Sequence, residues 1–97
     1  GAQVLVAFDE SIEAIEAASV ALNSGAEKKE VLALMKVAKR KLNKIESATV
    51  NRAKQESNKY LRFSRKALKE DDMGEAVEQM QKAVASYKNL KQIYLNF

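Results

Sequence analysis

The chain has 97 residues, a formal net charge of +4 and 46% hydrophobic residues, with three glycines and no proline. This composition is typical of one small folded domain and argues against a disordered, collagen-like or proline-rich segment. The chain also lacks cysteine and histidine, which excludes disulfides, thiol nucleophiles, imidazole bases and cysteine-based zinc sites. We therefore expect a single helical domain over residues 1–97 that is not an enzyme and that binds no metal or cofactor.

Apolar residues recur at steps of three and four from Phe8 to Leu22, and this spacing predicts a first helix over residues 9–23. Four acidic residues lie in its expected opening turns, where the helix dipole favours negative charge: Asp9, Glu10, Glu13 and Glu16. Residues 24–27 (Ser-Gly-Ala-Glu) then have the pattern of a capping box. A second helix is expected to begin there.

The second helix carries a heptad-like seam formed by Val31, Met35, Ala38, Leu42, Ile45 and Thr49. The next apolar series begins at Ala53, one residue out of register. The slip falls within residues 46–51, where Ser, Thr and Asn compete with helical hydrogen bonding, so we predict a break there between a second and a third helix. The alternative is one helix of about 45 residues, roughly 67 Å long, which would need a dimer partner.

Residues 70–74 (Glu-Asp-Asp-Met-Gly) form the clearest interruption, because Asp71 or Asp72 can cap the helix that follows. The rest of the chain is predicted to be a fourth helix. Its seam is the most regular in the chain: Met73, Ala76, Met80, Ala83, Tyr87, Leu90, Tyr94 and Phe97. Four helices with short connections predict an all-α, antiparallel four-helix bundle, whereas the unbroken alternative gives three helices with one long central helix in a dimer.

The stretch over residues 60–83 combines two expected helices with the acidic turn. The first helix carries Tyr60, Phe63 and the small Ser64, Met73 lies at the turn, and the second helix carries Ala76, Met80 and Ala83. These residues resemble a tetratricopeptide-type helical hairpin, and the stretch is also similar to the first hairpin of microtubule-interacting-and-trafficking domains. Asp71 stands where the turn glycine of such a hairpin usually lies. The resemblance implies two closely packed helices with small alanine contacts, in families that bind peptides or helices.

Charge is distributed unevenly. Residues 1–27 carry a net charge of −5, residues 28–69 of +11 and residues 70–97 of −2. Basic residues lie opposite the seam of the second helix and on one outward side of the third, where Asn58 interrupts the row. They predict an anion- or nucleic-acid-binding surface formed by Lys36, Arg40, Lys44, Arg62, Arg65 and Lys69. The alternative is a solvated face that the acidic first helix partly neutralises.

Two groups of acidic residues, in the first helix and at Asp71 and Asp72, are explained by helix ends more simply than by metal or acid–base chemistry. No histidine or further carboxylate completes a ligand set. Neither group is predicted to be a site.

Apolar and aromatic side chains surround the C-terminal end of the fourth helix instead of following one side. Such a turn needs cover on more than one face. We expect that either residues 4–6 (Val-Leu-Val) close this end or another chain covers it. In the second case the candidate partner-binding surface consists of Tyr87, Leu90, Ile93, Tyr94, Leu95 and Phe97. The alternative is that this stripe belongs to the core.

These patterns predict a non-enzymatic helical protein–protein interaction module or accessory structural module, which contacts another protein, or itself, through helices. The alternative is a small basic nucleic-acid-binding protein that uses the basic faces of residues 28–69. An anionic membrane surface is a third candidate partner. The longest apolar runs have five residues, against about 20 for a membrane span, so no transmembrane segment is predicted.

Overall fold

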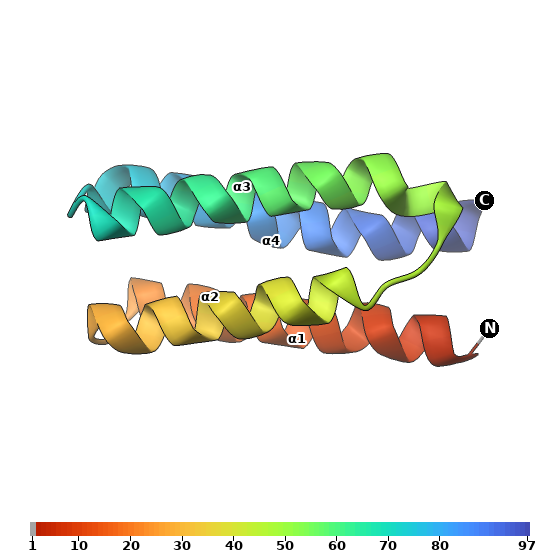
Figure 1. The fold of residues 1–97 in the computed structure, drawn as a ribbon, viewed down its shortest axis with the longest axis horizontal. Helices are drawn as coiled ribbons and strands as arrows, with labels where there is room; N and C mark the ends of the chain where they lie inside the picture. Colours follow the sequence, from red (N-terminus) through yellow and green to blue (C-terminus); the bar gives the residue numbers. More distant parts are fainter. Residues whose placement is uncertain (1) are drawn as a thin grey trace.

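The computed structural model describes residues 2–97. They form the helices α1 (Ala2–Asn23), α2 (Lys28–Asn43), α3 (Asn51–Lys69) and α4 (Met73–Asn96), with a short 3₁₀ helix, η1 (Ala48–Val50), before α3. One hairpin pairs α1 with α2 and another pairs α3 with α4, and the two hairpins stack as two layers (Figure 1). The molecule measures 39 × 19 × 16 Å. A single helix of roughly 67 Å does not fit these dimensions, and the four-helix prediction is confirmed.

The break between α2 and α3 lies where the apolar register slips. Residues 44–47 leave the helix and lead into η1. Ile45 and Val50 are buried and anchor the connection to the core, and the Lys54 ammonium donates to the Ile45 carbonyl at 2.9 Å. Thr49, which the heptad spacing placed on the seam, is exposed, because η1 turns Val50 inward instead.

Both hairpin turns end the preceding helix with a residue in the left-handed conformation: Gly25 at φ 77° after α1, and Asp71 at φ 60° after α3. In each turn the next amide donates to the carbonyl five residues back, at 3.0 Å and 2.9 Å. This Schellman arrangement satisfies carbonyls that a helix end otherwise leaves unpaired. Asp72 then caps α4, since its carboxylate accepts from the Glu75 amide at 3.2 Å.

Residues 24–27 do not form the expected capping box. The Ser24 hydroxyl donates back to the Ala21 carbonyl at 3.1 Å, and Glu27, which precedes α2, makes no side-chain cap. The physical reason is the left-handed Gly25: the turn closes the end of α1 and directs Ser24 towards that helix.

The helix α1 begins about two turns before the predicted range of residues 9–23. Val4 and Leu5 are half-buried against the core, and the Phe8 ring packs on that of Tyr94 from α4, with 5.2 Å between ring centroids. This packing extends the helix alongside the C-terminal end of α4, but Val6, the third residue expected to close this end, is 54% exposed. The first turn of α1 therefore contains no acidic residue, and the dipole does not explain its carboxylates.

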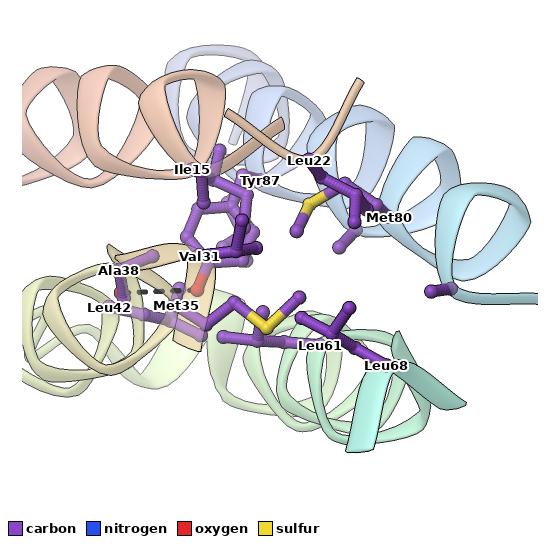
Figure 2. Packing of buried hydrophobic residues seen from close by; sticks show 14 of the residues in the cluster. Ile15, Leu22, Val31, Met35, Ala38, Leu42, Leu61, Leu68, Met80 and Tyr87 are labelled. Carbon is purple, nitrogen blue, oxygen red and sulfur yellow. Dashed lines mark hydrogen bonds between the residues drawn. The ribbon is translucent and has the colours of Figure 1, made fainter. Parts of the chain in front are cut away.

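The core lies between the layers and follows most of the predicted seams, but the two ends of the predicted α4 seam, Met73 and Phe97, are exposed. It includes Phe8, Ile15, Ala18 and Leu22 from α1, Val31, Met35, Ala38 and Leu42 from α2, Leu61, Ala67 and Leu68 from α3, and Ala76, Met80, Ala83, Tyr87 and Leu90 from α4. Figure 2 shows side chains of this cluster meeting between the helices. Within residues 2–97 no helix is both long and apolar enough to cross a membrane.

Small residues let α3 and α4 approach closely. The Ser64 hydroxyl donates to the Ala76 carbonyl at 2.7 Å, and the hydroxyls of Ser57 and Ser86 lie 2.5 Å apart. In contrast, α2 and α3 make the least extensive contact of the neighbouring helix pairs. The side of the bundle between α2 and α3 is therefore the place where the packing opens.

Candidate binding groove

The opening between α2 and α3 is a surface groove of about 890 Å³. The two helices run antiparallel along its sides and lie in front in Figure 1. Its length follows them for about 20 Å, at 1.5 Å per residue. We call it the basic groove, and its lining residues are Lys29, Leu32, Ala33, Met35, Lys36, Lys39, Arg40, Asn43, Lys44, Asn58, Leu61, Arg62, Arg65 and Lys69.

Helical spacing explains why one groove collects these residues. Along α2 and its C-cap residue they recur at short steps from Lys29 to Lys44, and along α3 from Asn58 to Lys69. Steps of three and four place side chains on one face of a helix. The predicted anion-binding residues are Lys36, Arg40, Lys44, Arg62, Arg65 and Lys69, and all six line the groove. The structure thus brings together two basic faces that the sequence left separate.

The electrostatics of the groove are one-sided. Eight of its fourteen lining residues are lysine or arginine, and none is acidic. The ion pairs of residues 2–97 lie elsewhere and contain no lining residue: Lys28–Asp71, Lys41–Glu10, Lys88–Glu16 and Lys91–Asp9. Three of the four use carboxylates of α1, which pair mainly with α4. The acidic first helix therefore leaves the groove with a concentrated positive potential.

The floor of the groove is apolar. Met35 and Leu61 are buried, Leu32 is half-buried and Ala33 is exposed. Figure 2 shows Met35 reaching from α2 towards Leu61 on α3. The aliphatic stems of the basic side chains add to this apolar surface while their charged ends reach water. The groove thus combines an apolar base with two cationic sides.

Two asparagines lie at the end of the groove nearest the connection between α2 and α3. The Asn58 amide donates to the Asn43 side-chain oxygen at 3.4 Å, and the Asn58 Oδ1 atom is buried with no hydrogen-bond partner. Asn58, which looked like an interruption of a basic row, is therefore part of the lining. Lys54, one turn earlier, turns away to the Ile45 carbonyl.

The sequence contained a signal for this floor that the heptad analysis missed. Leu32 and Ala33 lie off the core seam of α2, between Lys29 and Lys36 on the charged face. An apolar pair inside a basic row indicates a second, narrower apolar stripe on the same helix. Lys39 was also missed, because it lies beside the row of strict helical steps.

The predicted C-terminal partner surface is not one surface. Tyr87 and Leu90 are fully buried and belong to the core, which was the alternative explanation of this stripe, so they cannot reach a partner. Ile93 and Tyr94 are half-buried against the core. Leu95 is 52% exposed and Phe97 is 89% exposed.

Tyr87 connects α4 with α2 across the core. Its hydroxyl donates to the Ala38 carbonyl at 3.1 Å (Figure 2). Burial disfavours the phenolate form and raises the pKa of the Tyr87 hydroxyl well above its ordinary value of about 10. This hydroxyl is therefore a fixed donor within the fold.

Comparison of the chain with protein-family models, curated proteins and solved structures finds no match. Within residues 2–97, no group of three or more acidic side chains is arranged to hold a metal ion. The function is therefore inferred from the geometry of the groove.

Proposed function

We propose that this chain is a non-enzymatic protein–protein interaction module whose binding surface is the basic groove. The observation that carries the proposal is an apolar floor between two rows of basic side chains with no acidic partner in the described part of the chain. A ligand that covers the floor with an apolar surface is favoured because apolar area leaves water. The two rows of basic side chains favour a ligand with negative charge. A protein segment can supply both.

The likeness of residues 60–83 to hairpins of peptide- and helix-binding families supports the same class of function. The C-terminal half of α3, from Tyr60 to Lys69, belongs to this stretch and supplies most of one side of the groove. The α3–α4 hairpin is closely packed through small residues, so it offers a rigid wall to a ligand.

Site-specific photo-crosslinking in the cells that produce the protein tests this proposal. A photoreactive amino acid replaces Ala33 inside the groove or, as a control, Gln81 on α4, and both positions are exposed. We expect a discrete protein adduct from position 33 only. The groove variant, Lys36→Glu with Arg62→Glu and Arg65→Glu, should lose it. Equal adducts from both positions, or an adduct that nuclease removes, would contradict the proposal.

Nucleic-acid binding is the second candidate, favoured by the same eight basic residues. Because phosphate binding releases counterions, such a protein should retard DNA or RNA at about 50 mM salt and release it near 200 mM, and the groove variant should not bind. However, no aromatic side chain lines the groove, so bases find no aromatic stacking surface there. A protein partner is therefore our first choice.

A further inference from the structure

The direction of the basic groove fits an elongated ligand. It runs between two antiparallel helices for about 20 Å, the length of a helix of roughly 13 residues. A third helix that lies along such a pair places its ridge of side chains in the groove between them. The shape therefore matches the helix-in-groove form of peptide recognition.

The charges specify the flanks of this ligand. On α2 the basic residues include Lys29, Lys36 and Arg40, with Lys44 directly after the helix, and on α3 they include Arg62 and Lys69, so both sides are cationic along most of the groove. Lys36 and Arg40 are four residues apart on α2, and Arg62, Arg65 and Lys69 are three and four residues apart on α3, so carboxylates at the same spacing on a ligand helix repeat at about the same interval. The best complement carries acidic residues on both flanks.

The floor specifies what lies between the flanks. Leu32, which is half-buried, and the exposed Ala33 offer a narrow accessible apolar strip within the groove, whereas Leu61, which also lines it, is buried. We propose that the basic groove binds an amphipathic α-helix of a partner protein, with an apolar stripe on the floor and acidic residues along both edges. This inference rests on the proposed function and names the chemistry of the partner.

Other occupants match the groove less completely. A nucleic acid carries charge along its length but has no apolar stripe for the floor, and a lipid with one anionic head would engage only one end of two long basic rows. A second copy could offer α1, whose Val6 and Val20 are 54% and 67% exposed. However, three carboxylates of α1 already pair with lysines of the same bundle: Asp9, Glu10 and Glu16.

Synthetic helical peptides of about 18 residues test the inference with ¹⁵N-labelled full-length protein. The probe has leucines along one stripe and glutamates on both edges. One control replaces its glutamates with glutamine, and another keeps the composition but scrambles the order. We expect the probe to shift amide signals of residues 29–44 and 58–69. Both controls should bind at least about tenfold more weakly. The glutamine control removes the acidic charges, and the scrambled control removes the ordered apolar stripe.

A matched pair of variants locates the binding. The control variant changes three exposed basic residues outside the groove, Arg52→Glu, Lys66→Glu and Lys82→Glu, and so alters net charge as much as the groove variant does. We expect at least about tenfold weaker probe binding by the groove variant and a change within about twofold for the control variant. Circular dichroism and thermal melting establish that both are folded.

Equal binding of the probe and the scrambled peptide would overturn the inference, as would equal losses in the two variants. If position 33 still crosslinks to a protein, only the inference of a helical ligand fails and the proposed function stands. If position 33 gives no protein adduct, the inference and the proposed function both fail. Tighter, groove-dependent binding of duplex DNA or of phosphatidylserine-containing vesicles than of the probe at 150 mM salt would also overturn it. Self-association that the groove variant abolishes would assign the groove to a second copy instead.

Discussion

A single hydroxyl group links α4 to α2 across the core. A tyrosine hydroxyl that is buried without a partner destabilises a fold, so Tyr87 needs the Ala38 carbonyl as much as it needs apolar contacts for its ring. The carbonyl has two lone pairs and can accept this bond in addition to a helical one. The pair fixes how α2 and α4 lie across the core.

Replacing Tyr87 with phenylalanine should lower the free energy of unfolding by about 1 kcal/mol at pH 7, because the hydrogen bond is lost. As pH rises through about 10, the unfolded tyrosine loses its proton while the folded Tyr87, whose pKa is raised, keeps it. The unfolded state then binds fewer protons, and the wild type loses stability until pH reaches the folded pKa.

The Tyr87→Phe protein lacks this contribution, so the difference in stability should narrow above pH 10. Urea unfolding at pH 7 and pH 10.5 measures it, with Tyr60→Phe at a half-buried position as the control. A difference that stays constant between these two pH values would show that the hydroxyl is not shielded as described.

At the scale of the element, two glycines have opposite roles. Gly25 ends α1 at φ 77°, where a side chain is strained whatever the space around it. Gly74 lies in the first turn of α4 with no positive φ. A Cβ atom at either position meets nothing within 4 Å. Backbone conformation alone therefore distinguishes the two sites.

The same substitution at these glycines should change stability in opposite directions. We expect Gly25→Ala to lower the free energy of unfolding by about 1 kcal/mol, because alanine avoids the left-handed region. Gly74→Ala should raise it by about 0.5 kcal/mol, since alanine favours helix and restricts the unfolded chain. Thermal denaturation of the two variants decides this, and a shift of the same sign in both would contradict the turn geometry.

The helices themselves could be predicted from the sequence, because the seam residues from Val31 to Ile45 and from Ala76 to Leu90 follow strict spacing and are buried. The break near residues 46–51 was visible as a register slip. Residues 24–27 were misassigned because a serine that can cap one helix and a glycine that can end another are adjacent. Tertiary packing of Val4 and Leu5 extended α1 beyond its periodic part.

At the scale of the whole molecule, the basic groove concentrates positive charge between α2 and α3, the neighbouring helices that make the least extensive contact. Local patterns could predict that the basic residues of α2 and α3 lie on exposed helix faces. They could not predict that the two faces share one groove, because that depends on how the hairpins stack. Like charges on both sides disfavour close approach of the two helices, which is consistent with the limited contact between α2 and α3.

Salt should therefore stabilise this protein. Raising NaCl from about 20 to 500 mM screens the repulsion across the groove and should raise Tm by a few degrees, on the order of 1 kcal/mol.

The groove variant should melt higher than the wild type at low salt and respond less to added salt. The control variant should keep more of the wild-type response. Calorimetry at both salt concentrations measures these differences, and identical responses of the two variants would contradict a charge effect centred on the groove.

The stacking of two hairpins also sets the order in which the chain folds. Contacts within α1–α2 and α3–α4 close short loops, whereas the α1–α4 seam joins distant parts of the sequence and costs more loop entropy. We expect the hairpins to form early and to dock late. Weakening the seam with Phe8→Leu should then mainly accelerate unfolding, and weakening α3–α4 with Ser64→Ala should mainly slow folding, as stopped-flow kinetics would show. Such kinetics would show that the bundle folds as two units joined at one late-forming interface.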